Sequence, residues 1–263
     1  MNTRGIWGLV KLTGSSWMAQ RSFFFLLAFG WMIPPLIYLF VWSTAASSGT
    51  VGGFTRGDFV TYYLVLIIVN QFTFTSSNWT VGDSIRDGHM NAILLRPIPP
   101  ITDALANELA GKAVFLLFDI PVVIGLALIL HPELDPTAAR VVAFLPALMM
   151  AMLLRFFWGY ALALLAFWAT RADALLAVQD SLIFILAGQV APVALLPGII
   201  HTLALYLPFR YMVGFPIEVL TENLTNGELV AGFGVQIGWF VLALIVARAV
   251  WRAGIRRYEA VGG

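Results

Sequence analysis

Long apolar runs, each about as long as a membrane-crossing helix, follow one another along the chain. A helix needs about 20 apolar residues to cross a hydrocarbon core ~30 Å thick. Segments that meet this description are 22–42, 59–82, 113–130, a stretch within 141–170, 181–200 and 229–247. The strict alternation that a membrane β-barrel requires is missing. The pattern predicts an all-α integral membrane protein with six transmembrane helices.

The composition supports a membrane protein and narrows its function. Of the 263 residues, 60% are hydrophobic and only 11% are charged, whereas soluble domains carry about 25% charged residues. The net charge of +1 gives no reason to expect a nucleic-acid partner. The chain has no cysteine, which excludes disulfides, thiolate metal sites and a cysteine nucleophile.

The distribution of Lys and Arg predicts the orientation. With the N-terminus inside, eleven basic residues fall in inner segments and three in outer segments. The inner ones are Arg4, Lys11, Arg21, Arg86, Arg96, Lys112, Arg171, Arg248, Arg252, Arg256 and Arg257, and the outer ones are Arg56, Arg140 and Arg210. Because cytoplasmic loops are enriched in basic residues, we expect both termini to be cytoplasmic. In the tail, Arg248, Arg252 and Arg256 form a basic stripe that faces inner-leaflet headgroups.

Two segments on the inner side are candidates for surface helices. In 1–21, Arg4, Gly8, Lys11 and Ser15 share one helical face, which predicts an amphipathic helix lying on the inner membrane surface; a frayed tail is the alternative. In the cytoplasmic loop 83–111, Met90, Ile93 and Leu94 recur at helical spacing before a proline-rich stretch. A short amphipathic helix of this kind suits docking to a cytosolic partner, and an ordinary solvated loop is the alternative.

The segment 189–220 is too apolar for a free loop and too broken for a straight span. It contains Pro192, Pro197, Pro208 and Pro216. We expect short helices that dip into the outer leaflet and pack against protein. The acids Glu218, Glu222 and Glu228 are expected to form a solvated rim.

Polar residues at membrane depth are the candidates for a translocation pathway. Asn70, Gln71, Thr73, Thr75, Ser77 and Asn78 cluster in the second predicted span, and such side chains either line a pathway or hold helices together. Asp119 and Arg155 are the charges deepest in the membrane, and we expect them to pair directly or through water. Gln189 is a further candidate. The predicted pathway residues are Asn70, Gln71, Ser77, Asn78, Asp119, Arg155 and Gln189.

Motifs for covalent chemistry are absent. Gly111-Lys112 is the only Gly-Lys pair, and it lacks the other residues of a phosphate-binding loop. His89, His131 and His201 lie in separate segments without metal-ligand spacing, and no GxSxG elbow is present. We therefore expect a protein that is not an enzyme and binds no cofactor or metal, although an enzyme acting on lipids through an unfamiliar motif remains an alternative.

Three motifs resemble those of the type-2 ATP-binding-cassette (ABC) permeases, in the branch of small six-span bacterial permeases. They are IRDGHMNAILLRP (85–97), GQVAPVALLPGIIHTLALYLPFRYMVGFP (188–216) and RRYEAVGG (256–263). Each motif is loose by itself, but their order and spacing make the match specific, and together with the six-span layout the resemblance covers nearly the whole chain. Such permeases pair as two six-span halves in the bacterial inner membrane and bind two cytosolic ABC ATPase subunits, which hold ATP and Mg²⁺.

The resemblance implies a role for each segment. The loop around 86–97 would be a coupling helix that enters a cleft in the ATPase, 1–21 would be the connecting helix, and the broken segment 189–220 would close the outer end of the pathway. The implied coupling residues are Arg86, Asp87, Gly88, Met90, Leu94, Leu95, Arg96 and Pro97. A heterodimer of two permease chains is favoured over a homodimer.

The leading hypothesis is the permease half of an ATP-driven exporter for a hydrophobic or amphipathic substrate. A secondary transporter or channel that works without an ATPase is the alternative, but it should show internal repeats or more intramembrane charges. A structural membrane protein is a third possibility, against which the polar second span argues.

Overall fold

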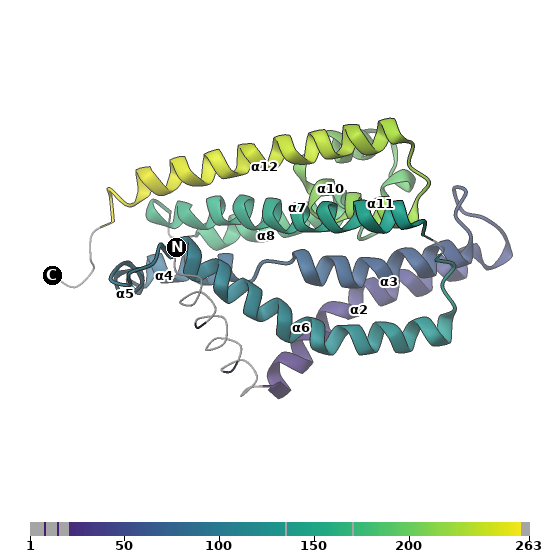
Figure 1. Ribbon diagram of the computed structural model, residues 1–263, viewed down its shortest axis with the longest axis horizontal. Helices are drawn as coiled ribbons and strands as arrows, with labels where there is room; N and C mark the ends of the chain where they lie inside the picture. The colour runs from purple at the N-terminus through teal and green to yellow at the C-terminus, as the bar shows by residue number, and fades with distance from the viewer. Residues whose placement is uncertain (1–7, 9–14, 16–20, 135, 170, 259–263) are drawn as a thin grey trace.

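The computed structural model describes residues 8, 15, 21–134, 136–169 and 171–258, and this part of the chain is helical with no β-strand (Figure 1). The predicted surface helix over 1–21 falls almost entirely outside the described residues. The α-helices are α2 (Arg21–Ala45), α3 (Arg56–Thr73), α4 (Ser77–Arg86), α5 (Met90–Leu94), α6 (Pro100–Leu130), α7 (Ala138–Ala163), α8 (Ala172–Leu186), α9 (Gly198–Tyr206), α10 (Pro208–Met212), α11 (Gly214–Thr221) and α12 (Asn226–Gly254). Short 3-10 helices cover Ala46–Ser48 (η1), Leu164–Phe167 (η2) and Val193–Leu195 (η3).

Five helical segments of the described chain are long and apolar enough to cross a membrane. They are Phe29–Ser48, Arg56–Arg86, Pro100–Leu130, Ala138–Phe167 and Asn226–Gly254. The predicted fifth span, 181–200, is not one helix, because α8 begins at Ala172 and ends at Leu186. At ~1.5 Å per residue its 15 residues span about 22 Å, which is less than a full hydrocarbon core.

The second predicted span is also discontinuous. Helix α3 ends at Thr73, Phe74 takes an extended conformation (φ −57°, ψ 138°), and α4 begins at Ser77. The local sequence explains the interruption, because Thr75, Ser76 and Ser77 carry hydroxyls that compete with the backbone for helical hydrogen bonds. The predicted loop 83–111 is mostly helical as well, since α4 runs to Arg86 and α6 begins at Pro100.

The bundle has two distinct ends (Figure 1). Helix α5, the start of α6 and the C-terminal end of α12 lie at one end, which we call the α5 end. The α2–α3, α6–α7 and α11–α12 connections lie at the opposite end. Helix α7 packs against α12, α11 and α3 and forms the centre of the bundle.

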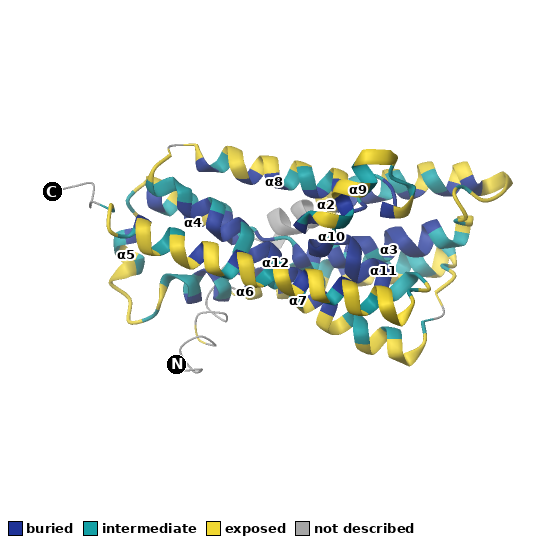
Figure 2. Cartoon of the chain, turned by 90° about the horizontal axis from the view of Figure 1, so that it is seen from above, coloured by how far each residue is buried: buried dark blue, intermediate teal, exposed yellow. Residues whose placement is uncertain are grey.

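The burial pattern is that of a protein surrounded by apolar solvent. Helices α3, α10 and α11 are largely buried, whereas α8 and α12 keep broad exposed faces (Figure 2). Exposed large apolar side chains occur on these two helices and on α6 and α7, among them Val178 of α8, Val241 and Ile245 of α12, Leu128 of α6 and Val142 of α7. In water such a surface would be unstable, so it is suited to contact lipid tails.

The prediction of short helices after α8 is confirmed: η3, α9, α10 and α11 follow in 193–221. The turn at the end of α8 is held by hydrogen bonds from the first two spans. Tyr62 donates its hydroxyl to the Gly188 carbonyl at 2.9 Å, and Tyr63 and Trp42 donate to the Val190 carbonyl at 2.9 and 2.8 Å. The chain can therefore leave its helix at this depth without losing its backbone hydrogen bonds.

The expectation of a solvated acidic rim in this segment is wrong for Glu218. Its side chain is only 3% exposed and accepts hydrogen bonds from Arg210 Nε at 3.0 and 3.1 Å, with a further ion pair to Nη2 at 2.5 Å. Burial of the carboxylate is possible because this bidentate partner replaces water. Glu228 does remain exposed, where it completes a capping box with Thr225 at the start of α12.

Candidate functional site

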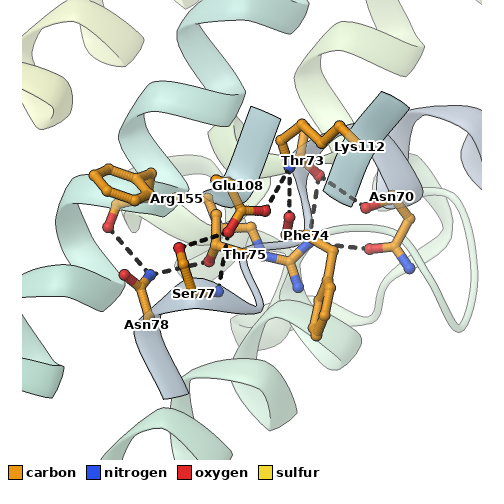
Figure 3. Close-up of polar contacts among 10 residues, drawn as sticks. Asn70, Thr73, Phe74, Thr75, Ser77, Asn78, Glu108, Lys112 and Arg155 are labelled. Atoms are coloured by element: carbon orange, nitrogen blue, oxygen red, sulfur yellow. Dashed lines mark hydrogen bonds and ion pairs between the residues drawn. The ribbon is translucent and has the colours of Figure 1, made fainter. Parts of the chain in front are cut away.

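A carboxylate from the third span binds the N-terminal end of α4. Glu108 of α6 accepts hydrogen bonds from the Ser77 backbone N–H at 3.0 Å and from the Ser77 hydroxyl at 2.6 Å (Figure 3). The first N–H groups of a helix have no partner within the helix and carry a partial positive charge. A buried carboxylate is a favourable ligand for them, so Glu108 stabilises the restart of the helix after its break.

A lysine one turn further along α6 binds the other side of the break. Lys112 donates to the Phe74 carbonyl at 2.6 Å, just past the end of α3, and pairs with Glu108 at 2.9 Å (Figure 3). Carbonyl groups at a helix C-terminus attract cations. The two side chains are only 5% and 3% exposed. Glu108 and Lys112 therefore supply hydrogen-bond partners for the backbone groups on both sides of the α3–α4 break.

Arg155 of α7 connects the break to α8. Its Nη1 donates to Asn70 at 3.1 Å and Thr73 at 3.3 Å, and its Nη2 pairs with Asp180 at 3.3 Å. Asn70 also accepts a hydrogen bond from Gln189 at 3.3 Å. The Arg155 side chain is 3% exposed. The arginine thus joins three segments that are distant in sequence around one buried charge.

The direct pairing of Arg155 with Asp119 that we expected as one possibility is wrong. Asp180, which the sequence did not single out, occupies the position of the partner. Asp119 is buried on α6 (1% exposed), and neither of its carboxylate oxygens has a hydrogen-bond partner among the described residues. The Arg155 side chain is directed towards the α3–α4 break and α8, where it contacts Asn70 and Asp180.

The side chains of the remaining polar residues of the second span also face the protein interior. Gln71, Ser77 and Asn78 are buried, and the Asn78 amide donates to Thr75 at 3.0 Å and to the Phe156 carbonyl at 3.2 Å. Gly159 permits this close approach, since a Cβ there would lie 2.4 Å from the Asn78 side-chain nitrogen. Five of the predicted pathway residues therefore form hydrogen bonds within this chain, namely Asn70, Ser77, Asn78, Arg155 and Gln189.

The predicted coupling segment forms a helical turn at the α5 end. Helix α4 ends at Arg86, Gly88 reverses the chain with a positive φ of 77°, and α5 follows. Met90 is 1% exposed and packs into a cluster with Val81 and Ile85, which anchors α5 to the bundle. The hydroxyl of Tyr258 donates a hydrogen bond to the Gly88 carbonyl at 3.2 Å. The segment directly after α12 therefore stabilises the same turn.

Two leucines are presented outward from this anchored segment. Leu94 is 37% exposed and Leu95 is 87% exposed. Around them Arg86 pairs with Asp83 and Asp87, and Arg96 pairs with Asp103. The helix stops before Pro97, as the prolines predicted. The result is an apolar tip with a charged surround, which is the composition of a small protein-docking surface.

No group of three or more His, Asp or Glu side chains that could hold a metal ion occurs in the described residues. Two of the buried acids, Glu108 and Glu218, instead have cationic or backbone partners. Such pairs position helices.

Sequence reasoning missed Glu108, Lys112 and Asp180. The signal for the first two was present, because a Glu and a Lys four residues apart stand at the start of an apolar helix. The sequence analysis places Glu108 in the loop 83–111 and Lys112 in an inner segment, because it expects the third span to begin at 113. Gln236 was missed too; it is fully buried and donates to the Ala147 and Tyr211 carbonyls, both at 3.0 Å.

A sequence model of the ABC-2 family transporter proteins matches residues 32–262. The matched region begins within α2 and includes the α3–α4 break, the segment 85–97 and the segment 188–216. No curated protein matches the sequence.

Proposed function

Because the chain belongs to the ABC-2 family of transporter proteins, we propose that it is the permease subunit of an ATP-driven exporter for hydrophobic or amphipathic substrates. Membership in the family makes it a multi-pass membrane protein and a transport component of an ABC transporter, which is not itself catalytic. The family also implies association with an ABC ATPase subunit. We further propose the direction of transport, the class of substrate and the assembly of the subunits.

The observation that carries the proposal is the construction of the α5 end. Leu94 and Leu95 project from a turn that Met90 and Tyr258 fix to the bundle. A partner that pushes on α5 would move α4 and α6 with it, since both adjoin α5. ATP and Mg²⁺ would be bound by the cytosolic ATPase, and closure of the ATPases would rearrange the spans through this segment.

The orientation follows from charge. Arg86, Arg96 and the arginines at the end of α12 belong to the α5 end (Figure 1), and cytoplasmic ends of membrane proteins are enriched in basic residues. We therefore place the α5 end and both termini in the cytoplasm, with the protein in the inner membrane. In this arrangement α8 and the short helices after it make the fifth crossing together, α12 makes the sixth, and α9–α11 form a re-entrant outer segment.

A substrate would pass between two permease chains rather than through one. The polar residues around the α3–α4 break form hydrogen bonds within this chain. A translocation pathway therefore requires either that these bonds break or that a second permease chain supplies part of the lining. We favour a heterodimer, in which the substrate passes along the second span and α8 and contacts Asn70, Arg155 and Gln189 when the break rearranges.

The test is co-purification of the chain with its ATPase and measurement of ATP-dependent transport in vesicles. Leu95→Asp places a charge on the exposed tip of α5, and we expect it to abolish transport while membrane insertion is retained. Leu134→Asp is the matched control, because Leu134 is also exposed (42%) but lies in the α6–α7 connection at the opposite end. Transport by the chain alone, without an ATPase, would instead support a secondary transporter or channel.

A further inference from the structure

A cavity of about 480 Å³ opens at the α5 end, between the start of α6, the last turns of α7 and the end of α12. This volume is within the range of small-molecule binding sites, about 300–1,000 Å³. Its wall is mainly apolar, with Leu105 of α6, Phe157 and Tyr160 of α7, and Leu244 of α12. No residue of this cavity belongs to the buried network at the α3–α4 break.

The mouth of the cavity is positively charged. Arg248 and Arg252 stand one turn apart on α12 and both line it. Neither has a carboxylate within ion-pairing distance among the described residues, in contrast to Arg86, Arg96, Arg155 and Arg210. Helix α6 begins at Pro100 on the other side of the mouth without a side-chain cap, and its N-terminal dipole adds to the positive potential.

The combination of an apolar wall and a cationic mouth defines the chemistry of a ligand. Trp251 lines the cavity beside the two arginines, and tryptophan prefers the boundary between lipid tails and headgroups. A soluble anion would leave the apolar wall uncovered, and a neutral apolar molecule would leave the arginines without a partner. A ligand with both an anionic head and an alkyl chain satisfies both.

We propose that this cavity binds one anionic phospholipid from the surrounding leaflet. The phosphate lies between Arg248 and Arg252, and an acyl chain lies along Leu105, Phe157 and Leu244. That the leaflet is the inner one rests on the orientation proposed above, whereas the cavity and its charge do not depend on that orientation. The bound lipid links α12 to the start of α6, directly after the predicted coupling segment.

The experiment is native mass spectrometry of the full chain, purified with its partner subunits and supplied with phosphatidylglycerol or phosphatidylcholine. We expect selective retention of phosphatidylglycerol. Arg248→Gln/Arg252→Gln should weaken phosphatidylglycerol binding about tenfold or more and leave phosphatidylcholine binding unchanged. Leu244→Trp, which fills the cavity, should reduce retention while both arginines remain.

Matched variants distinguish lipid binding in the cavity from non-specific attraction of anionic lipids to basic residues. Arg256→Gln/Arg257→Gln removes two exposed arginines of the same tail that do not line the cavity, and it should bind phosphatidylglycerol as the unmodified chain does. Arg248→Lys/Arg252→Lys keeps the charge and reports whether the glutamine variant fails only through misfolding. Equal binding of the two lipids, or an equal loss in the Arg256/Arg257 control, would overturn the proposal. The readout is binding, so it is independent of transport and of the coupling assignment.

Discussion

Glu108 and Ser77, which stand 31 positions apart in sequence, form a two-donor contact in which one carboxylate oxygen accepts both the backbone N–H and the hydroxyl of the serine. The contact allows an interrupted helix to exist inside the bundle, because it supplies the acceptor that the missing helical turn would have provided. Lys112 supplies the donor for the Phe74 carbonyl on the other side of the break. The buried charges at the break are thus consequences of backbone geometry.

Removal of one member of this buried pair should be strongly destabilising. We expect Glu108→Gln to lower the free energy of unfolding by about 3–5 kcal/mol, because it leaves the Lys112 charge buried without its counter-ion. The double variant Glu108→Gln/Lys112→Met should lose less than the sum of the two single variants. Thermal unfolding in detergent measures this. Asp103→Asn is the control, since the Asp103–Arg96 pair is partly exposed and such pairs contribute about 0–1 kcal/mol.

Arg155 should be energetically coupled to Asp180 and independent of Asp119. A double-mutant cycle of Arg155→Gln with Asp180→Asn is expected to show a coupling of about 0.5–3 kcal/mol, because these side chains form an ion pair. The cycle of Arg155→Gln with Asp119→Asn should be additive within about 0.5 kcal/mol. Folded yield and melting temperature report both cycles. The reverse result would place Asp119 in the network.

Gly88 should be sensitive to substitution through its backbone conformation alone. Its φ of 77° disfavours side chains, although a Cβ there would meet no atom within 4 Å. We expect Gly88→Ala to destabilise the chain by about 1–2 kcal/mol and to reduce ATP-dependent transport. The control is Gly234→Ala in α12, where a Cβ is also unopposed and alanine is the better helix former. Similar losses in both variants would contradict this explanation.

The hydroxyl of Tyr258 should stabilise the predicted coupling turn. Tyr258→Phe removes the hydrogen bond to Gly88, which is expected to cost about 0.5–1.5 kcal/mol locally while the ring stays packed on Phe167. Hydrogen exchange of the amides in 85–95 should become faster. Tyr206→Phe is the control, since Tyr206 is 74% exposed in α9. Unchanged exchange in Tyr258→Phe would show that the contact contributes nothing to the turn.

The outer segment should lose stability between about pH 4.5 and 7. Burial, and next the neighbouring Glu218 carboxylate, raise the pKa of Glu222 from 4.5 to about 7. The folded chain therefore binds a proton that the unfolded chain has already released in this window, so stability falls as the pH rises through it. Glu222→Gln should flatten this part of the curve of melting temperature against pH. An unchanged slope would mean that Glu222 titrates normally.

Several features of the fold could be predicted because they depend on composition along the chain. Apolar runs of span length predicted most of the membrane helices, and the five long helices of the described chain fall on them. Prolines predicted the end of α5 before Pro97 and the short helices of 193–221. These are local properties, since hydropathy and proline geometry act on the segment that carries them.

Partners across the bundle could not be predicted in the same way. Arg155 is recognisable from the sequence as a costly intramembrane charge, but its partner is Asp180, and the sequence places both Glu108 and Lys112 outside the membrane spans. Which side chains meet depends on the rotation and depth of each helix, and packing sets both. The break after Thr73 added donors and acceptors that a continuous helix would not offer.

The sequence by itself determined a helical membrane protein with an apolar surface, a basic end and a proline-limited turn, because hydropathy, charge and backbone restriction belong to each residue wherever it lies. Only the tertiary structure decided that Glu108 and Lys112 hold the two sides of a broken span, that Asp180 neutralises Arg155 and that Asp119 has no hydrogen-bond partner among the residues that the structure describes. A buried charge is stable only where a partner comes within hydrogen-bonding distance, and that distance is a property of the packed helices.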